Sequence, residues 1–256
     1  MRLTRCFIDA PLSPGAILAL PDTAVAHLTR ALRLGPGARF ALFNGDGHDY
    51  EAELAQVDRR GASAEVIAAR RVDSESPLTL VLAQAVARGE KMDFVLQKAA
   101  ELGAAGIVPL VTERSEVRLD AERGEKRRAH WQGILAAACE QCGRARLPAL
   151  GPVATLANWL VGAPAPGLDA RSDSPDQRLP LFYLDPDAET TLRDLPEAAR
   201  AGACFVIGPE GGLGERDLAL LRASGAIGIR LGPRVLRTET AGLALLAAMQ
   251  ALYGDF

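Results

Sequence analysis

The amino-acid sequence predicts an α/β protein in which a small, mostly β domain precedes a larger domain built on a parallel sheet. In the first 72 residues, short strand-like runs are separated by turn signals and interrupted by one helical segment. After Pro77, near-continuous apolar runs of strand length alternate with helix-length segments, which is typical of a parallel sheet covered on both faces. A chain of 256 residues can bury about 70–75% of its unfolded surface, so we expect a core without disulfides.

Turn signals and apolar periodicity define the N-terminal strands. Asn44-Gly45 and Asp46-Gly47 favour tight hairpin turns, and they stand between the strand-like runs ARFALFNG and HDYEAELAQV. Together these signals predict a small β barrel. Its predicted strands comprise residues 6–9, 38–45, 48–57 and 63–72.

One helix is expected among these strands, at residues 22–34, with Pro21-Asp22 as its start and Gly35 as its stop. The apolar positions that we expect to be buried in one stripe are Val25, Leu28 and Leu32. Basic side chains follow at steps of three on another side of the helix, at His27, Arg30 and Arg33. That side is either a solvated basic face or a contact surface for phosphates.

A polar segment at residues 70–77 ends in Pro77 and has the composition of a linker. We therefore divide the chain into a domain of residues 1–72 and a domain of residues 73–256. In the second domain we expect strands at residues 78–86, 107–112 and 179–184, and helices at residues 91–102, 125–141 and 155–161. The segment 162–178, rich in Pro, Asp and Ser, is predicted to be a mobile surface loop.

Two glycine-punctuated loops near the C-terminus are the most informative feature of the chain. GPEGG at residues 208–212 and LGPRVLRTET at residues 231–240 each follow an apolar run and lead into a helix-forming segment. Because glycine lacks a Cβ, a ligand can approach the main chain closely at such loops. Two of them at one edge of a sheet would form a ligand site from backbone.

The residues that follow the first loop restrict this ligand. A phosphate-binding P-loop requires a lysine and a Ser or Thr, whereas Gly214-Glu215-Arg216-Asp217 begins the next helix with two acidic residues. The spacing of a GxGxxG dinucleotide fingerprint is not met either, which disfavours a nicotinamide oxidoreductase. Two interpretations remain: a neutral or cationic ligand near Glu210, or a plain turn in which glycine and proline only serve geometry.

Composition adds broad limits. The net charge of −3 gives no general attraction to nucleic acid and leaves room for a local basic face. The first residues lack an apolar stretch, and the longest apolar run, residues 241–249, is far shorter than the ~20 residues that span a bilayer. We therefore expect a cytoplasmic protein with four reduced cysteines. Cys139 and Cys142 lack the second ligand pair that zinc needs, so we predict no metal site.

Seven segments in order resemble the RsmE family of the SPOUT superfamily of RNA methyltransferases. They are HLTRALRL, LFNGDG, KMDFVLQKAAELG, IVPLVTERS, ACEQCGR, GPEGG and LGPRVLRTETA. The resemblance covers essentially the whole chain, and it implies a PUA-like RNA-binding barrel followed by an α/β domain with a trefoil knot. It further implies S-adenosyl-L-methionine as methyl donor, a homodimer, and 16S ribosomal RNA of the small ribosomal subunit as substrate, methylated at N3 of a specific uridine.

The resemblance implies that three loops form the cofactor pocket, with backbone groups at the adenine edge and leucines beside the ring. The implied cofactor-binding residues are Leu184, Ile207, Gly208, Pro209, Glu210, Gly211, Gly212, Leu231, Gly232, Val235, Leu236, Arg237, Thr238, Thr240 and Ala241. Leu236 could equally be an ordinary core residue. Thr238 or Thr240 could also N-cap the final helix, which we expect to end near Tyr253. At Gly214, where the family usually has Ser or Thr, glycine remains a serviceable N-cap.

The implied chemistry suggests catalytic candidates. Uracil N3 carries a proton and is a poor nucleophile until that proton leaves. A cation aimed at a uracil carbonyl would stabilise the anion by roughly 3–4 kcal/mol, and Arg237 is the candidate. Glu210 or Glu239 could accept the proton, a contribution of about 10²- to 10⁴-fold. A purely structural ion pair between Arg237 and Glu239 is the alternative.

Basic residues of the N-terminal domain are the expected phosphate contacts, which position RNA without reading its sequence: Arg2, Arg5, His27, Arg30 and Arg33. The family resemblance adds Glu140, Gln141 and Arg144 on the substrate side. Two other functions remain open. One is a catalytically silent RNA-binding factor of ribosome assembly that kept the fold, and the other is a SPOUT methyltransferase that modifies a ribose 2′ oxygen.

Overall fold

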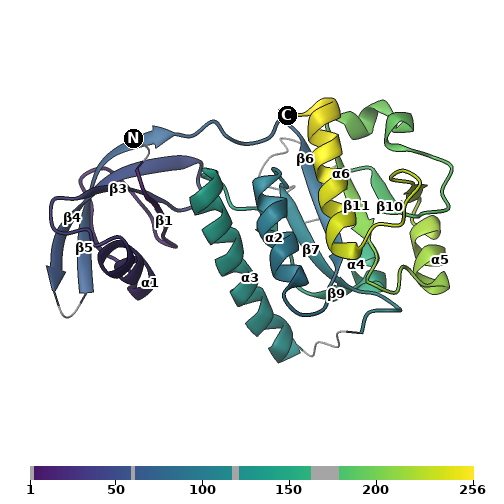
Figure 1. The fold of residues 1–256 in the computed structure, drawn as a ribbon, viewed down its shortest axis with the longest axis horizontal. Coiled ribbons are helices and arrows are strands. Elements are labelled where there is room, and N and C mark those ends of the chain that lie inside the picture. Colours follow the sequence, from purple (N-terminus) through teal and green to yellow (C-terminus); the bar gives the residue numbers. More distant parts are fainter. Residues whose placement is uncertain (1–2, 59–60, 117–120, 163–178) are drawn as a thin grey trace. The chain divides into compact units, whose positions relative to one another are not determined.

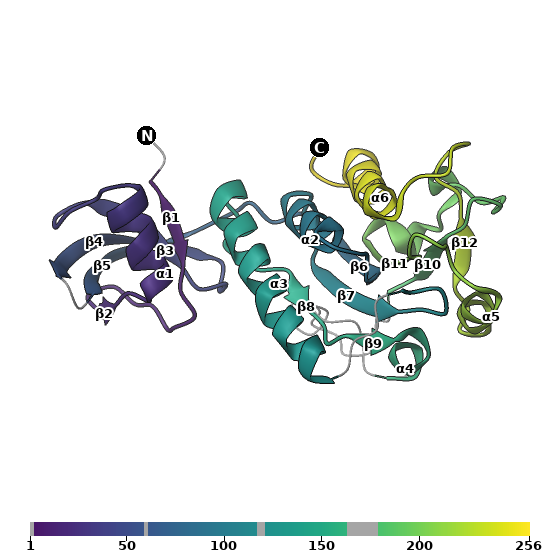
Figure 2. The same ribbon diagram turned by 60° about the horizontal axis from the view of Figure 1, so that its bottom comes forward.

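The computed structural model describes residues 3–58, 61–116, 121–162 and 179–256. Arg2 and nearly all of the predicted loop 162–178 lie outside these residues. The described chain forms two compact units, residues 1–75 with 136–147 and residues 76–135 with 148–256. We describe each unit by itself (Figures 1 and 2). No helix in these described ranges has the length and apolar character needed to cross a membrane.

The first unit contains a five-stranded mixed sheet in the order β1-β3-β4-β5-β2. The bounds are β1 Arg5–Phe7, β2 Ile17–Ala19, β3 Arg39–Phe43, β4 His48–Asp58 and β5 Gly61–Arg71. β1 pairs in parallel with β3, and the other neighbours are antiparallel. The four predicted strands are present; β2 was not predicted, because three residues at a sheet edge carry too little periodicity.

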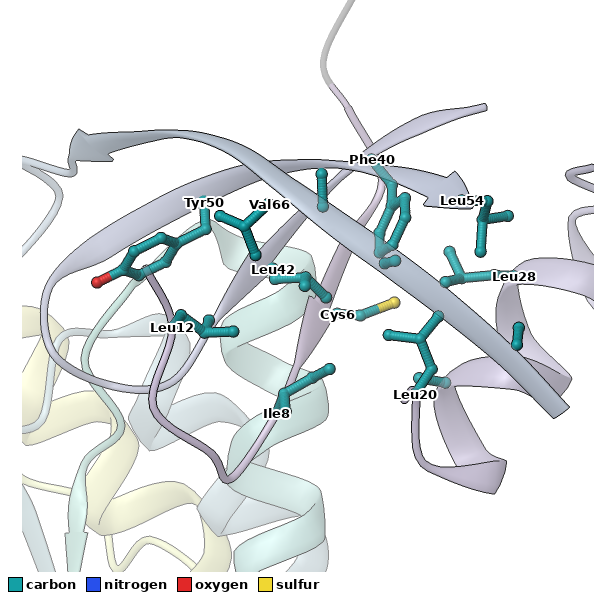
Figure 3. Packing of buried hydrophobic residues seen from close by; sticks show 14 residues of the cluster. Cys6, Ile8, Leu12, Leu20, Leu28, Phe40, Leu42, Tyr50, Leu54 and Val66 are labelled. Carbon is teal, nitrogen blue, oxygen red and sulfur yellow. The ribbon is translucent and has the colours of Figure 1, made fainter. Parts of the chain in front are cut away.

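Alternating side chains of these strands form the core of the first unit (Figure 3). Phe40 and Leu42 of β3, Leu54 of β4 and Val66 of β5 are fully buried against Leu28. Core residues two positions apart recur in each strand, as Phe40 and Leu42 do in β3, Ala52 and Leu54 in β4, and Ala64 and Val66 in β5, which is expected for one face of a sheet.

The predicted helix 22–34 is only partly α-helical. α1 covers Asp22–Val25, and a π-helix follows at Ala26–Ala31, in which the Leu32 N–H donates to the His27 carbonyl, 3.0 Å away. The wider π turn changes which positions share a face. Leu28 is buried as predicted, whereas the prediction for Leu32 was wrong, since this residue is 41% exposed.

The second unit is built on a parallel sheet in the order β12-β10-β11-β6-β7-β8. The bounds are β6 Thr79–Ala85, β7 Gly106–Val111, β8 Ala149–Leu150, β10 Leu181–Leu184, β11 Gly202–Ile207 and β12 Ile227–Ile229, with β9, Ala154–Thr155, also paired to β7. The predicted parallel-sheet α/β class is confirmed. Strand order does not distinguish a knotted from an unknotted path, so the knot stays a prediction.

Helices cover both faces of this sheet. Their bounds are α2 Lys91–Glu101, α3 Ala121–Cys142, α4 Leu156–Val161, α5 Glu215–Ala223 and α6 Thr238–Tyr253. α2 and α6 pack against each other on one face (Figure 1). α6 can lie close to the sheet because Gly242 has no Cβ; a Cβ at this position would lie 2.9 Å from the Leu82 side chain. On the other face, Leu156 of α4 and Leu221 of α5 pack onto alternate residues of β6, β7 and β11.

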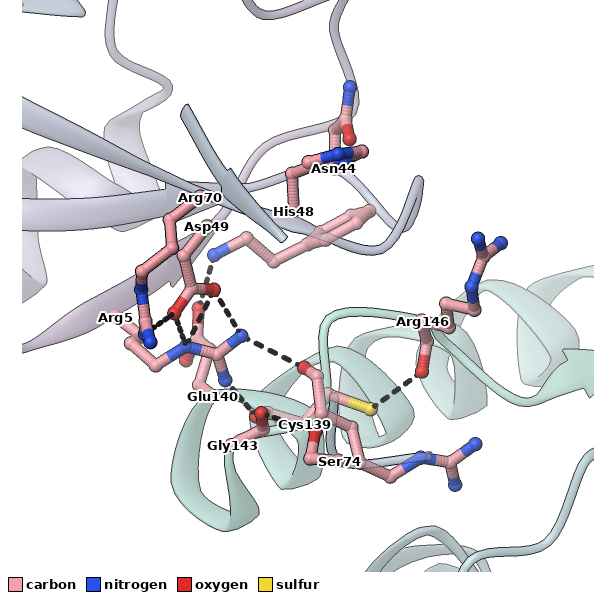
Figure 4. A network of polar contacts seen from close by, with 12 residues as sticks. Arg5, Asn44, His48, Asp49, Arg70, Ser74, Cys139, Glu140, Gly143 and Arg146 are labelled. Atoms are coloured by element: carbon pink, nitrogen blue, oxygen red, sulfur yellow. Dashed lines mark hydrogen bonds and ion pairs between the residues drawn. The ribbon is translucent and has the colours of Figure 1, made fainter. Parts of the chain in front are cut away.

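Residues 136–147 pack with the first unit, although the sequence placed them in the second domain. Buried Arg5 explains this. Its guanidinium pairs with Asp49 at 2.7 Å and donates to the carbonyls of Cys139 and Arg144 at 2.6 and 3.0 Å (Figure 4). The Phe7 N–H adds a bond to Glu140 Oε1 at 2.8 Å. A buried arginine needs such partners, and these carbonyls lie far along the chain.

Candidate functional site

A cavity of about 410 Å³ lies where the segments after β10, β11 and β12 meet. Parallel strands bring their carboxyl ends to one edge of the sheet, and ligands of open α/β sheets bind at this edge. The lining residues include the last residue of each strand and part of the segment after it: they fall within residues 184–186 at β10, 207–213 at β11 and 229–239 at β12. The two glycine loops of the sequence therefore form walls of one cavity.

Three glycines give these walls their shape. Gly212 and Gly232 line the cavity with φ of +71° and +79°, a conformation that favours glycine, and a Cβ added to either would contact nothing within 4 Å. A Cβ at Gly208 would lie 3.0 Å from the Leu213 nitrogen. The Gly208 position is therefore closed to larger residues by packing, whereas Gly212 and Gly232 present bare backbone.

Thr238 ties the two loops together at the base of the cavity. Its hydroxyl donates to the Gly208 carbonyl at 2.6 Å and accepts from the Gln84 amide, 2.9 Å away. Gln84 is fully buried in β6. The N-cap of α6 is Arg237, and its side chain makes no cap bond. The prediction that Thr238 or Thr240 N-caps this helix was therefore wrong, because the Thr238 hydroxyl is committed to the neighbouring loop.

Lys91, in the first turn of α2, adds a positive charge to the cavity wall. The sequence did not predict this residue as part of the site. Its Nζ lies 3.2 Å from Glu210 Oε1 and 3.5 Å from Glu239 Oε2. Glu239 Oε2 is buried and has no hydrogen-bond partner of good geometry among the described residues. The loops themselves lack a lysine, but Lys91 from α2 adds one positive charge, which the two carboxylates compensate.

Hydrogen bonds hold Glu210 in its ionised form. Burial opposes ionisation, yet the carboxylate accepts from its own backbone N–H, from the Arg88 N–H and from Lys91, and the net effect lowers the pKa of Glu210 below its ordinary value. A carboxylate with a lowered pKa is a weaker proton acceptor. Of the two predicted acceptors, Glu210 is thus the less suited.

Arg237 lines the cavity with a side chain that is 81% exposed. Its Nη1 lies 4.0 Å from Glu239 Oε1, at the outer limit of an ion pair. Exposed pairs of this kind contribute about 0–1 kcal/mol. The alternative of a rigid structural pair is therefore weak, and the guanidinium is free to turn toward a molecule at the mouth of the cavity.

Thirteen of the fifteen predicted cofactor-binding residues line the cavity. They are Leu184, Ile207, Gly208, Pro209, Glu210, Gly212, Leu231, Gly232, Val235, Leu236, Arg237, Thr238 and Ala241. Gly211 and Thr240 do not line it. The Gly211 carbonyl accepts from Arg114 Nη1 at 3.0 Å, which turns that residue toward the loop after β7. The residues that prediction missed include Lys91, Asp185 and Arg234.

Glu113 caps the helix that follows the GPEGG loop. Gly214 is the N-cap of α5 and has no side chain to offer. Glu113 Oε2 instead accepts from the Arg216 N–H at 3.0 Å, while Asp217 accepts from the Gly214 N–H at 3.1 Å and from the Glu113 N–H at 3.0 Å. A Cβ on Gly214 would overlap the Glu113 carboxylate. Gly214 lacks the capping hydroxyl of Ser or Thr, and Glu113 from the loop after β7 supplies the missing hydrogen-bond acceptor.

Two of the predicted RNA-binding residues are placed otherwise than expected. Arg5 and Arg144 are buried in the first unit. Arg5 pairs with Asp49, and Arg144 Nη2 lies 2.8 Å from Glu75 Oε2. Because both guanidinium groups are engaged in the interior, they are not placed to contact phosphates, and the prediction for them is corrected to a structural role.

The other predicted RNA-binding residues have mixed positions. His27, Arg30, Arg33 and Gln141 are exposed. Arg33 has a φ of +56°, which ends the helix two residues before the expected stop at Gly35. Glu140 is half-buried and accepts from the Phe7 N–H. The basic side of the helix is therefore available for contact, and its use for RNA stays a prediction.

Comparison with known proteins identifies both parts of the chain. A family model described as an RNA methyltransferase domain matches residues 74–250, and one described as an RNA methyltransferase PUA domain matches residues 20–67. The chain is similar to ribosomal RNA small subunit methyltransferase E of Bacillus subtilis, with 30% identity over 99% of this chain and 100% of the relative.

Solved structures agree with these matches. Ribosomal RNA small subunit methyltransferase E of Neisseria gonorrhoeae, bound to S-adenosyl methionine, superposes with a TM-score of 0.85 and 36% identity over 100% of both chains. A methyltransferase of Legionella pneumophila in complex with the same cofactor gives a TM-score of 0.89 and 36% identity, again over 100% of both chains. The chain therefore belongs to the ribosomal RNA small subunit methyltransferase E family, with a PUA domain followed by a SPOUT-type methyltransferase domain.

Proposed function

We propose that this protein is an S-adenosyl-L-methionine-dependent methyltransferase that methylates N3 of a specific uridine in 16S ribosomal RNA of the small ribosomal subunit. The observation that carries the proposal is the cavity walled by bare backbone at the carboxyl ends of β10, β11 and β12. Support comes from two relatives of 36% identity that were solved with this cofactor.

The residues of the cavity suit this cofactor. Leu184, Leu231 and Leu236 offer apolar surface for an adenine ring, and a cavity of about 410 Å³ falls in the range of roughly 300–1,000 Å³ typical of small-ligand sites. Glu239 presents a buried carboxylate oxygen that lacks a well-formed hydrogen bond among the described residues. That oxygen would favour a cationic ligand such as a sulfonium. When bound, the cofactor supplies an electrophilic methyl group.

The chain's own residues would make uracil N3 nucleophilic. The exposed guanidinium of Arg237 can turn toward a uracil carbonyl and stabilise the negative charge that develops when the N3 proton leaves. Glu239 is the carboxylate better suited to accept that proton, because the hydrogen bonds on Glu210 keep its pKa low. Lys91 positions both carboxylates and remains a positioning residue.

Two further proposals follow from the family. The protein acts in the cytoplasm, where ribosomal subunits are assembled, and it works as a homodimer. Large apolar side chains exposed on the second unit support an interface there: Phe94 on α2, Leu252 on α6 and Phe256. Sedimentation equilibrium should give twice the chain mass of 27.0 kDa, and a monomer at micromolar concentration would contradict the dimer.

The direct test of the reaction is incubation with unmethylated small ribosomal subunits and S-adenosylmethionine labelled in its methyl group, followed by nucleoside analysis. We expect labelled 3-methyluridine. Label recovered only in a 2′-O-methyl nucleoside would contradict the N3 assignment. If the folded protein binds the subunit without any transfer of label, the silent assembly factor would be the better account.

A further inference from the structure

A second cavity lies within the first unit, apart from the helix on which RNA contacts were predicted. It has a volume of about 390 Å³ and is formed by the end of the hairpin between β3 and β4, the end of β5, the segment after β5, and one residue that follows α3. Its lining comprises Gly47, His48, Arg71, Val72, Asp73, Glu75 and Arg146. None of these residues belongs to the methyltransferase cavity.

One ion pair and several backbone hydrogen bonds join the segments that form this cavity. Glu75 accepts from Arg144 at 2.8 Å and from the Arg146 N–H at 3.2 Å. The Gly47 carbonyl accepts from the Val72 N–H at 2.9 Å, and the Gly47 N–H donates to the Ala145 carbonyl at 3.2 Å. In Figure 4, Cys139 Sγ donates to the Arg146 carbonyl, and the Arg146 side chain extends away from the buried Arg5–Asp49 pair. The segments that form the cavity are thus fixed to one another.

The Arg146 guanidinium lies against Gly47 although its side chain is exposed. A Cβ built on Gly47 would lie 2.9 Å from Nη2, 3.1 Å from Cζ and 3.1 Å from Nε of Arg146. Three nearly equal distances mean that the guanidinium plane lies face-on across the glycine. One face of the plane is therefore covered by backbone. Planar guanidinium groups stack on nucleobases in single-stranded RNA.

The remaining charges of the lining are exposed and of both signs. Arg71 and Arg146 have no ion-pair partner among the residues that the structure describes, and Asp73 on the same rim is exposed as well. Glu75 is neutralised by Arg144. Arginines supply donors to a phosphate or to a base edge, whereas an aspartate accepts from an exocyclic amine. A lining with both kinds of group suits a whole nucleotide better than a bare phosphate.

We propose that this cavity binds one nucleotide of single-stranded ribosomal RNA, with its base against Arg146 and its phosphate near Arg71. The inference rests on the proposed function, because it assigns a substrate contact to an RNA methyltransferase. It places RNA recognition at the hairpin end of the first unit, in addition to any contact by Arg30 and Arg33. His48 also lines the cavity, and its ring would offer a second flat surface for the base.

The test measures the affinity of the full-length protein for unmethylated small ribosomal subunits and for a fluorescent single-stranded oligoribonucleotide of mixed sequence. The variants are Arg71→Gln and Arg146→Gln. The matched control is Arg39→Gln, which removes one exposed arginine of the same unit that is paired with Glu51. Thermal melting and calorimetric binding of S-adenosylmethionine are recorded for every variant.

We expect Arg71→Gln and Arg146→Gln each to weaken RNA binding about tenfold, and Arg39→Gln to leave it within about twofold. For Arg71→Gln, the salt dependence of binding should fall by about one phosphate contact. Cofactor binding should be unchanged in all three variants. Affinities of the two cavity variants equal to that of Arg39→Gln would overturn the proposal. Failure of the wild type to bind the cofactor would count against the proposed function alone.

Inorganic phosphate distinguishes the two possible sources of binding. If a nucleotide is recognised, millimolar phosphate should not displace the oligoribonucleotide beyond its effect on ionic strength, and Asp73→Asn should change the preference among homopolymeric RNAs. Displacement by phosphate, together with an unchanged preference in Asp73→Asn, would show that the cavity holds only an anion, and this result would contradict a nucleotide site.

Discussion

At the scale of single residues, the arrangement of Lys91, Glu210 and Glu239 separates two carboxylates that look equivalent in the sequence. One ammonium group lies within 3.5 Å of both. Glu210 additionally accepts from two backbone N–H groups, whereas Glu239 Oε2 is buried without such bonds. The same cation therefore contacts one carboxylate that accepts backbone hydrogen bonds and one that does not, and this difference underlies the proposal that Glu239 is the proton acceptor.

Substituting the two carboxylates should separate their roles. Glu239→Gln should lower kcat for methyl transfer by about 10²-fold or more, since it removes the proposed proton acceptor. Glu210→Gln should keep kcat within about tenfold of wild type, because a carboxylate with a lowered pKa takes little part in proton transfer. Single-turnover methylation at saturating cofactor measures both effects. A larger loss in Glu210→Gln than in Glu239→Gln would reverse the assignment.

The pH dependence of stability tests the state of Glu210 independently of activity. A carboxyl group whose folded pKa is below its unfolded value stabilises the fold above the unfolded pKa and loses this contribution as the pH falls through the folded pKa. The free energy of unfolding of the wild type should therefore exceed that of Glu210→Gln near pH 7. This difference should shrink between about pH 5 and pH 3. A difference that grows on acidification would contradict the lowered pKa.

At the scale of elements, the start of α5 shows how one loop compensates for a residue missing from another. Gly214 gives the helix no capping side chain, and Glu113 from the loop after β7 supplies the acceptor for the Arg216 N–H. Asp217 returns two bonds, to the Gly214 N–H and the Glu113 N–H. The helix start is thus also the contact that holds the loop after β7 against the loop after β11.

A double-mutant cycle should reveal this compensation. Glu113→Ala should destabilise the protein by about 1 kcal/mol, as the loss of an N-cap does. Gly214→Ser should destabilise the wild type, because its Cβ would overlap the Glu113 carboxylate. In the Glu113→Ala background the same serine should stabilise, since the space is free and its hydroxyl can cap. Urea unfolding measures all four proteins; additive effects would mean that the two positions do not compete.

The elements also show what a sequence can and cannot predict. Strands β6, β7 and β11 were predictable because long apolar runs mark buried parallel strands. The turn at Ala26–Ala31 was not, because the apolar spacing at Val25, Leu28 and Leu32 fits an α-helix and nothing local signals a π-helix. The consequence was one misplaced core residue, Leu32.

At the scale of the whole molecule, the site brings together segments far apart in the sequence. The glycine loops were recognisable because glycine has a specific backbone use, and they do line the cavity. Lys91 and Gln84 were missed, although they contact Glu210 and Thr238 from more than 100 residues away. The periodicity of apolar residues in a sequence does not indicate contacts between side chains so far apart along the chain. Arg5 and Arg144 were misassigned for the same reason, since their buried partners become evident only in the fold.

The central claim, that the glycine-walled cavity binds S-adenosylmethionine, is tested most directly by calorimetry on three proteins: wild type, Gly232→Ala and Gly225→Ala. Gly232 and Gly225 have φ of +79° and +80°, and a Cβ on either would contact nothing within 4 Å, so both substitutions place an alanine at nearly the same positive φ. Only Gly232 lines the cavity. We predict that wild type and Gly225→Ala bind the cofactor alike and that Gly232→Ala binds at least about tenfold more weakly, a loss of ~1.4 kcal/mol. Equal affinity in all three proteins, or no binding by a cooperatively folded wild type, would contradict the account.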